Sequence, residues 1–369
     1  MIMKLDTPML LKENRVWRIY QGGRCIDELR RKTSLADGFF PEDWVGSVTH
    51  AVNRGREHLK NEGLSTIVLR EGNSAYDMVF ADLLKDKTVA LDFFGEKHVA
   101  AFGPSPEILV KLLDSKIRLP LQTHPDRDFA KKHLNAKYGK TECWIVLGGR
   151  EIDNEKPHVY FGFKDNVTKN DFDSWFKAQD VSAMLNALNK IYVTPGDVFS
   201  IPANIIHAVG PGVFLAEIQE PSDLVFHFDR KGPCWDLDDY QTHMNLGGQR
   251  MLDTLDYSIQ GKNILETYQT RFDPTAAREG VQKVLPGFMS SYFNCNYVTA
   301  YNLPRDASSF MMCIVYQGAG KIVSKGDTLV VHQGDTFLVP FSAVSVRYES
   351  DSTVSPLRIV EALPPEIPQ

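Results

Sequence analysis

The chain has few cysteines, and their arrangement defines no structure. Five cysteines occur among 369 residues, they lie far apart, and none forms a C-x-x-C pair. This pattern argues against a disulfide framework and against a zinc site built from thiolates. We expect five reduced and mostly buried thiols.

Long apolar runs and a strong net charge are also absent. No run approaches the roughly 20 residues needed to span a bilayer, and residues 1–14 lack the apolar segment of a signal peptide. The formal net charge is -6, and a mildly acidic protein is a poor general binder of nucleic acid or anionic membrane. The sequence predicts a cytoplasmic protein without nucleic-acid or membrane partners, in which the positive charge for any anionic substrate is local.

Two segments of the chain repeat each other. Residues 196–202 read GDVFSIP and residues 334–340 read GDTFLVP, each a Gly-Asp turn, an alternating strand and a final proline. The preceding segments match when they are aligned by their cysteines. Residues 143–149 (CWIVLGG) and 313–318 (CIVYQG) both read as an apolar strand running into a glycine turn. Two copies of one β unit are the simplest explanation.

The first copy differs from the second by an insertion over about residues 165–190. Apolar side chains recur there three and four residues apart, which predicts two amphipathic helices. We expect further helices over residues 75–85 and 126–135. Residues 260–287 contain two prolines and are expected to form an irregular connection.

Four side chains with oxygen or nitrogen donors fall on predicted neighbouring strands. In the segment LPLQTH (residues 119–124), Gln122 and His124 lie two apart and share a face if the segment is a strand. Glu142 lies on the next strand, and His207 follows the GDVFSIP strand. These donors suit one divalent metal ion, zinc first, with manganese, iron or cobalt as alternatives. A further coordination position would be open to water or substrate.

The repeat supplies an internal comparison for this metal hypothesis. A single histidine is more often a hydrogen-bonded core residue than a ligand, so the spacing alone leaves both interpretations open. His207 lies eleven residues after Gly196, whereas the residue eleven after Gly334 is Ser345. We therefore expect metal in the first copy and a structural role for the second.

A set of motifs resembles the type I mannose-6-phosphate isomerases. The motifs are ILVKLLD (108–114), QTHPD (122–126), GKTE (139–142), GD (196–197), IP (201–202), HAVG (207–210), AEIQ (216–219) and SD (222–223), with Glu42-x-Trp44 and Trp17 nearer the N-terminus. They span roughly the first 230 residues. The second β unit fits the short bacterial architecture of this family.

The resemblance implies a fold and a cofactor. The expected fold is mainly β, with two cupin (jelly-roll) barrels and a helical insertion in the first. Residues 1–260 would form the metal-bearing catalytic domain, and residues 261–369 a C-terminal cupin domain without metal ligands. The expected cofactor is one zinc ion, held by Gln122, His124, Glu142 and His207.

The resemblance also implies a reaction. Mannose 6-phosphate and fructose 6-phosphate interconvert when a proton moves between carbons 1 and 2 through an enediol. A metal ion can stabilise charge on the sugar oxygens, and a positioned acid or base carries the proton. Lys140 and Glu217 match active-site positions of the family, although Lys140 could act only electrostatically and Glu217 could only orient a ligand. Trp17, Lys111, Asp223 and Lys231 are the expected substrate contacts.

Two positions depart from the family pattern, and both concern the phosphate. Pro120 replaces a serine that helps to bind phosphate, and proline offers neither a hydroxyl nor a backbone N–H. His227 stands at the position of an active-site arginine, although a short deletion after it would let Arg230 serve instead. Because a buried phosphate needs partners, at least two of the cationic groups of Arg230, Lys231 and Lys111, or else Lys140, should then point into the metal cleft. If His227 points there and the cations face solvent, we expect an uncharged sugar, with His227 as a hydrogen-bonding or acid/base partner.

The sequence therefore predicts a metal-dependent aldose–ketose isomerase of carbohydrate metabolism, acting on mannose 6-phosphate. The first alternative is the same chemistry on another phosphorylated or free sugar. The second is a non-catalytic sugar-sensing cupin. Lys140, Glu142 and Glu217 argue against a sensor, because sensing does not require an acid/base set.

Overall fold

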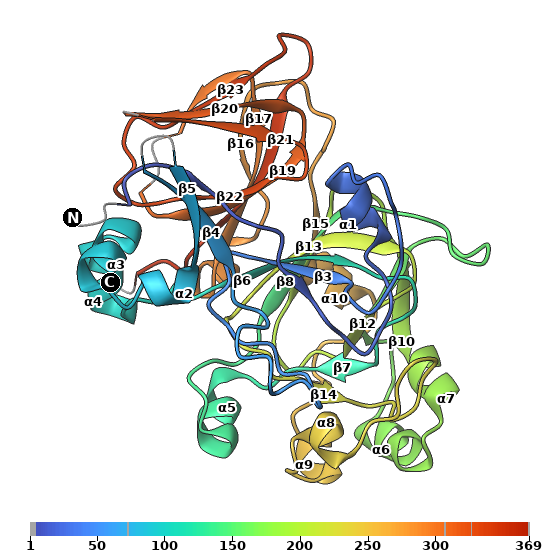
Figure 1. Cartoon of the computed structure of the whole chain (residues 1–369). Helices are drawn as coiled ribbons and strands as arrows, with labels where there is room; N and C mark the ends of the chain where they lie inside the picture. Colours follow the sequence, from blue (N-terminus) through green and yellow to red (C-terminus); the bar gives the residue numbers. More distant parts are fainter. Residues whose placement is uncertain (1–4, 72–73, 306–307, 326, 368–369) are drawn as a thin grey trace.

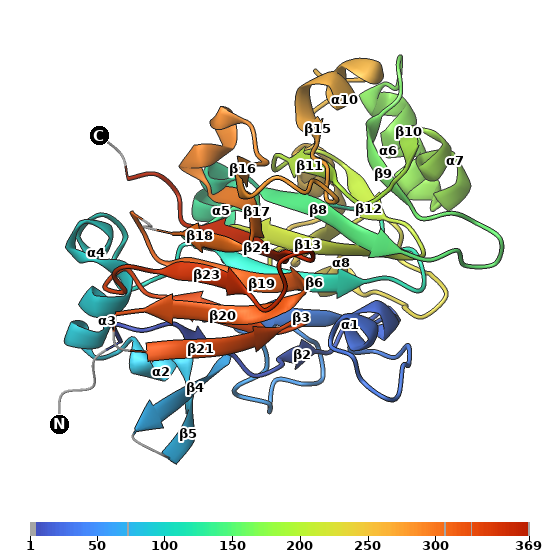
Figure 2. The same ribbon diagram turned by 90° about the horizontal axis from the view of Figure 1, so that it is seen from above.

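A computed structural model describes residues 5–71, 74–305, 308–325 and 327–367, and β-strands dominate it (Figure 1). The described residues form five sheets, of which four stack as two pairs (Figure 2). The prediction of a mainly β chain is therefore confirmed. Within the described residues, no helix combines the length and apolar character needed to cross a membrane.

The first pair of sheets is built from residues of the N-terminal two thirds of the chain and one later strand. Its seven-stranded sheet has the order β15 (Gln269–Arg271), β11 (Asp197–Ile201), β8 (Glu142–Gly149), β13 (Val213–Gln219), β6 (Leu109–Asp114), β3 (Glu42–Val45) and β2 (Arg15–Val16). Its five-stranded sheet has the order β10 (Leu188–Tyr192), β9 (His158–Phe163), β12 (His207–Val209), β7 (Gln122–Thr123) and β14 (Phe226–His227).

The second pair of sheets is built from the C-terminal third and one N-terminal strand. The six-stranded sheet has the order β1 (Met9–Leu10), β22 (Thr336–Val339), β19 (Met311–Gln317), β24 (Leu357–Leu363), β17 (Asn294–Ala300) and β16 (Gly280–Lys283). The four-stranded sheet has the order β18 (Asn302–Pro304), β23 (Arg347–Ser350), β20 (Ala319–Ser324) and β21 (Asp327–His332). A separate hairpin joins β4 (Thr66–Glu71) to β5 (Ser74–Val79).

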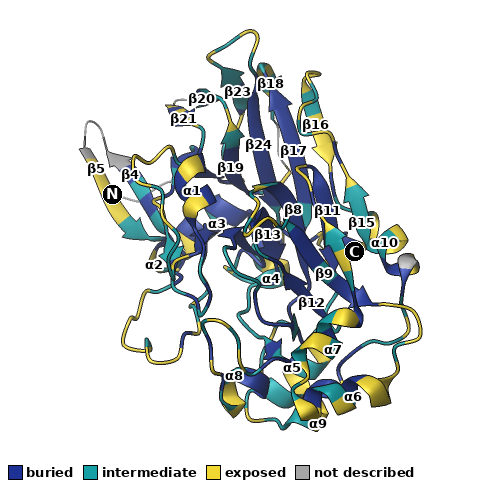
Figure 3. Cartoon of the chain, turned by 90° about the vertical axis from the view of Figure 1, so that its right-hand side faces the viewer, coloured by how far each residue is buried: buried dark blue, intermediate teal, exposed yellow. Residues whose placement is uncertain are grey.

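Side chains of the central strands point alternately to the two faces of their sheet, which explains why the sheets stack. In β8, Cys143, Ile145 and Leu147 point into a core shared with the six-stranded sheet, whereas Trp144 and Val146 point toward the five-stranded sheet. Both faces of the strand are buried, as Figure 3 shows for the central strands. Successive side chains of a strand face opposite ways, so one apolar strand serves two cores.

Each sheet pair takes one edge strand from the other part of the chain. Met9 of β1 pairs with Leu338 at the edge of the six-stranded sheet. Gln269 of β15 pairs with Phe199 at the edge of the seven-stranded sheet. The two halves are therefore joined by backbone hydrogen bonds as well as by the shared core.

The repeated segments form corresponding strands, but the alignment by cysteines is wrong by one residue. The two GD segments form β11 and β22, which pair with β8 and β19. Phe199 lies opposite Trp144, and Phe337 lies opposite Cys313. Trp144, rather than Cys143, thus corresponds to Cys313, because side-chain direction sets the register.

The helices lie at the ends and edges of the sheets. They are α1 (Arg24–Leu29), α2 (Phe80–Leu83), α3 (Lys87–Phe94), α4 (Glu96–Phe102), α5 (Arg127–Leu134), α6 (Lys169–Ala178), α7 (Val181–Asn186), α8 (Asp239–His243), α9 (Gly248–Leu252), α10 (Lys262–Tyr268) and a 3₁₀ turn (Gly287–Ser291). Helices α6 and α7 confirm the two predicted amphipathic helices, and α5 confirms the one expected over residues 126–135. Asp126 caps α5 through the Phe129 N–H, as a first-turn acid should.

Two expectations are wrong. Residues 74–79 form β5 rather than a helix, because they pair with β4 along its whole length, and only Phe80–Leu83 is helical. Residues 260–287 are not an irregular connection, since they contain α10, β15 and β16. In the first case pairing with the adjacent strand β4 decides the local structure, and in the second β15 and β16 pair with β11 and β17.

Candidate metal centre and active site

His124, Glu142 and His207 meet between the two sheets of the first pair. Glu142 begins β8, His207 begins β12, and His124 directly follows β7. One donor atom from each lies within 4.8 Å of the others, and all three residues are buried. His124 Nε2 is 3.3 Å from Glu142 Oε2, and His207 Nε2 is 3.4 Å from Glu142 Oε1.

Backbone carbonyls fix how the two imidazole rings face this point. His124 Nδ1 lies 2.9 Å from the Leu224 carbonyl oxygen, and His207 Nδ1 lies 2.9 Å from that of Ile205. A carbonyl only accepts, so each Nδ1 carries the hydrogen and each Nε2 turns its lone pair toward Glu142. Burial lowers the pKa of both histidines, which keeps them neutral, the form that binds a metal.

The donor set fits a divalent cation. Glu142 Oε1 and His207 Nε2 are buried and have no hydrogen-bond partner within the described parts of the chain. Buried polar atoms are normally paired, and two imidazole nitrogens with a carboxylate form a familiar zinc donor set. Gln122 lies opposite His207 in the ladder between β7 and β12, and its side chain lines the cavity beside the cluster.

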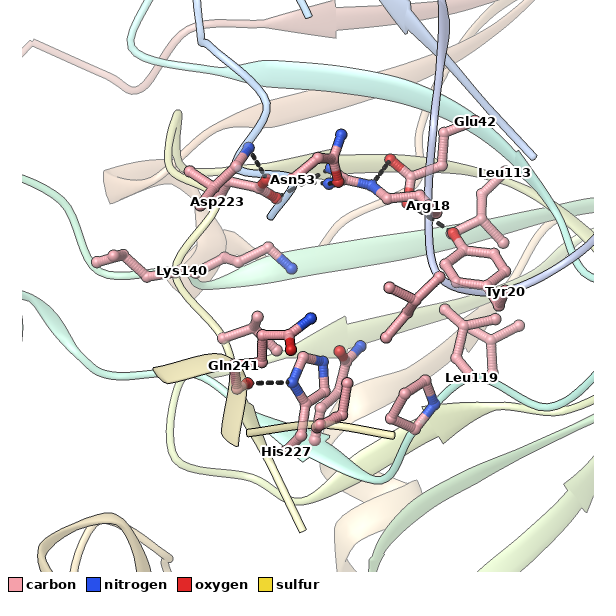
Figure 4. Close-up of a pocket in the computed structure, with 18 of the residues that line it drawn as sticks. Arg18, Tyr20, Glu42, Asn53, Leu113, Leu119, Lys140, Asp223, His227 and Gln241 are labelled. Atoms are coloured by element: carbon pink, nitrogen blue, oxygen red, sulfur yellow. Dashed lines mark hydrogen bonds and ion pairs between the residues drawn. The ribbon is translucent and has the colours of Figure 1, made fainter. Parts of the chain in front are cut away.

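A cavity of about 180 Å³ adjoins the cluster. Residues predicted for substrate binding or catalysis line it from both sheets and from the loops around them. They are Trp17, Lys111, Lys140, Glu217, Asp223 and His227. Figure 4 shows Lys140 extending into the cavity between Asp223 on one side and His227 on the other.

Acidic and basic groups alternate across the floor of the cavity. Lys140 Nζ is 2.6 Å from Glu142 Oε2 and 3.8 Å from Glu217 Oε1. Lys111 Nζ is 3.3 Å from Glu217 Oε2 and 3.8 Å from Glu42 Oε2. Burial and the negative charge of Glu142 raise the pKa of Glu217. Burial opposes ionisation of Glu142 as well, but Lys140 and His207 outweigh it and lower its pKa. The two carboxyl groups, though close, thus have different proton affinities.

The upper wall of the cavity is built around Arg18, which the sequence did not identify. Its guanidinium is bonded to both oxygens of Asp223, to the Asn53 side chain and to Glu42. Tyr20 donates a hydrogen bond to Glu42 at 2.6 Å. These residues come from segments far apart in the chain, so no spacing could reveal the contact. The only sequence signals were the neighbouring Trp17 and the Glu-x-Trp and Ser-Asp motifs.

The two residues that depart from the family pattern lie in the cavity, whereas two of the cations expected to compensate for them do not. Pro120 and His227 line the cavity, and burial lowers the pKa of His227 to about 4, so its ring is neutral at neutral pH. Arg230 lies outside this cavity and bonds Asp239 at 2.8 Å. The Lys231 side chain is 79% exposed. Of the three cations expected to replace the missing phosphate contacts, the structure brings only Lys111 into the cavity, and Lys140, the stated alternative, also lines it.

Two curated relatives and two solved structures that are similar to this chain are named mannose-6-phosphate isomerases. No protein-family model matches the chain. It is 27% identical to the mannose-6-phosphate isomerase ManA of Bacillus subtilis over 274 residues (71% of this chain, 79% of that protein). It is 27% identical to the mannose-6-phosphate isomerase of Streptococcus mutans over 275 residues (72% and 79%).

Solved structures agree with these relatives. The mannose 6-phosphate isomerase from Bacillus subtilis matches with a TM-score of 0.67 and 21% identity, over 96% of this chain and 99% of that one. A zinc-bound mannose 6-phosphate isomerase matches with a TM-score of 0.70 and 13% identity, over 98% and 100%. The structures share the fold, and the curated relatives confirm the predicted resemblance.

Proposed function

We propose that the chain is a metal-dependent aldose–ketose isomerase that interconverts mannose 6-phosphate and fructose 6-phosphate. The relatives that cover most of its length carry that name. The observation that carries the proposal is that Lys140, which lines the cavity together with Glu217, lies 2.6 Å from Glu142 of the His124–Glu142–His207 cluster. A sugar in that cavity would meet a metal centre and an acid/base pair together.

Zinc is the proposed cofactor, held by these three residues with the amide oxygen of Gln122 as a fourth ligand. The donor types favour it, and a structural neighbour is zinc-bound. When bound, a divalent cation polarises sugar oxygens and stabilises the charge that develops on them. The two carbonyl contacts that fix the imidazole rings prepare the site for it.

The proposed proton transfer rests on Lys140 and Glu217. Both side chains line the cavity, and Glu217 Oε1 is 3.8 Å from Lys140 Nζ. A group that moves a proton between carbons 1 and 2 must reach both carbons on one face of the sugar, and we assign that role to one of these two residues. Trp17 and Asp223 also line the cavity and would orient the rest of the sugar.

We also propose that the two sheet pairs are two cupin modules, the first of residues 1–260 with the helical insertion and the second of residues 261–369. Each pair encloses a core of its own in addition to the shared one. The paired GD segments and their register support a duplicated unit. In the second module, nothing corresponds to the His124–Glu142–His207 cluster among the described residues.

One observation favours a second candidate, the same isomerisation of an unphosphorylated sugar. Every described cation that lines the cavity is already paired with a carboxylate: Arg18 with Asp223 and Glu42, Lys111 with Glu217, Lys140 with Glu142, and Arg54 with Asp238. A phosphate dianion would have to compete for these partners, whereas hydroxyls would not. The cavity thus contains many charged groups, but its positive charges are balanced by neighbouring carboxylates.

A coupled isomerase assay over phosphorylated and free hexoses, with zinc, manganese or cobalt added to metal-stripped protein, tests the proposal. The expected result is metal-dependent turnover of mannose 6-phosphate. Turnover of free mannose with equal or higher kcat/KM would select the second candidate. No turnover of any sugar by protein that contains stoichiometric metal would instead support a sugar sensor.

A further inference from the structure

His227 enters the cavity with a fixed orientation. It lies on β14, and its Nδ1 is 2.7 Å from the backbone carbonyl oxygen of Gln241 in α8 (Figure 4). The carbonyl can only accept, so Nδ1 carries the ring hydrogen. In the neutral ring, Nε2 then has a lone pair and no hydrogen, and no described residue hydrogen-bonds to it.

The lone pair of Nε2 has three conceivable partners in this cavity. A metal ion is the first, but His227 does not belong to the cluster in which donor atoms converge. A phosphate is the second, yet a phosphate dianion presents only acceptor oxygens, which an unprotonated nitrogen repels. A sugar hydroxyl is the third, and it supplies the hydrogen that Nε2 needs.

We propose that Nε2 of His227 accepts a hydrogen bond from a substrate hydroxyl outside the reacting carbons 1 and 2, which makes His227 a specificity-determining residue. The inference rests on the proposed isomerase function for the identity of the sugar. It assigns to this position a role opposite in polarity to that of an arginine, which can only donate. The phosphate must therefore be bound elsewhere than at His227.

Deletion of single hydroxyls from the ligand tests the contact directly. We would measure kcat/KM for mannose 6-phosphate and its 3-deoxy and 4-deoxy analogues with the wild-type holoenzyme and with H227A, H227Q and H227R. Calorimetric titration with the corresponding sugar alcohol phosphates, which cannot isomerise, measures binding independently of turnover. Elemental analysis and thermal melts establish that each variant is folded and retains its metal.

The expected result is that the wild-type enzyme rejects one deoxy analogue by roughly 10-fold, the value of one hydrogen bond. H227A should lose that discrimination while it keeps the discrimination against the other analogue. H227Q, whose amide oxygen can accept at a similar place, should restore part of it, and H227R should not. The same pattern should appear in the calorimetric affinities.

Two results would overturn the inference. One is unchanged discrimination against both deoxy analogues in H227A. The other is a higher KM in H227A for mannose 6-phosphate but not for mannose, which would mean that this position contacts the phosphate. If no variant or wild-type protein turns over sugar but the binding pattern holds, the isomerase proposal fails and the His227 contact stands.

Discussion

Glu217 and Glu361 occupy corresponding places in the two halves of the molecule. The same substitution should mainly lower stability at Glu361 and mainly lower activity at Glu217. Glu217 lies opposite Trp144 in the ladder, and Glu361 lies opposite Cys313, the residue that corresponds to Trp144. Both carboxyl groups are buried. Replacement of either by glutamine keeps the shape and removes one charge.

Glu361 is fully engaged by its neighbours. Arg305 binds it through two nitrogens, at 2.8 and 2.6 Å, and Asn296 and Tyr348 donate to it at 3.0 Å. Glu361→Gln would leave the Arg305 charge without its partner in a site that is 13% exposed. Breaking a buried ion pair in this way costs about 3–5 kcal/mol. We expect that loss in urea unfolding, with metal content and kcat unchanged.

Glu217 is less completely paired, and its neighbours have alternatives. After Glu217→Gln, Lys140 keeps Glu142 at 2.6 Å and Lys111 keeps Glu42 at 3.8 Å. The stability loss should be smaller, about 1–3 kcal/mol. If Glu217 moves the proton, kcat should fall by about 10²–10⁴-fold.

For both variants, urea denaturation measures the stability and the coupled isomerase assay measures kcat, on the same preparations. The reasoning fails if Glu217→Gln retains full activity, or if Glu361→Gln lowers kcat as much as Glu217→Gln does. Glu217→Gln that loses metal together with activity would show that Glu217 orients a ligand instead. Metal content therefore has to be measured for both.

Three further outcomes are expected. Glu142→Gln should lower metal affinity at least about 100-fold, more than loss of an outer partner does, and elemental analysis that finds unchanged metal would refute its role as a ligand. Burial opposes ionisation of Glu42, but Arg18 and Lys111 outweigh it and hold its pKa at about 2 against 4.5 unfolded. The lowered pKa contributes about 3 kcal/mol to the free energy of unfolding above pH 4.5. This contribution is lost as the pH falls toward 2. In Glu42→Gln the melting temperature should therefore fall less steeply between pH 4.5 and pH 2 than in the wild type. Arg230→Ala should change KM for mannose 6-phosphate less than twofold, because Arg230 bonds Asp239 outside the cavity; a large rise in KM would mean that substrate reaches it.

Strand patterns and a family resemblance together located the metal cluster in the sequence. His124 and Glu142 lie at the end and the start of segments with clear strand patterns, and His207 follows a turn that the repeat marks. Strand spacing suggested the converging set, but it left a hydrogen-bonded core histidine as an open interpretation, and the family resemblance selected the ligands. A different periodicity, apolar side chains three and four residues apart, identified the helices of the insertion.

The wall of the cavity that is built around Arg18 could not be found from strand or helix spacing. Arg18, Asn53 and Asp223 are joined only because the chain brings three loops together. A side chain in a loop follows no period, and its partner can be any distance away in the sequence. The wrong helix over residues 75–85 has a related cause, because pairing with β4 overrides local preference.

The two buried glutamates differ in how completely their neighbours satisfy them. Opposite Glu361 the strand β17 supplies Asn296, and Arg305 fills the remaining space, so every oxygen is satisfied. Opposite Glu217 the strand β6 supplies Lys111, whose charge is shared with Glu42, and a cavity remains beside it. A carboxyl group that shares its partners and borders a cavity can exchange a proton with a ligand, whereas a fully bonded one cannot do so without breaking its network. If Glu217 moves the proton as proposed, that role depends on its incomplete pairing, whereas Glu361 lies in a closed network around Arg305.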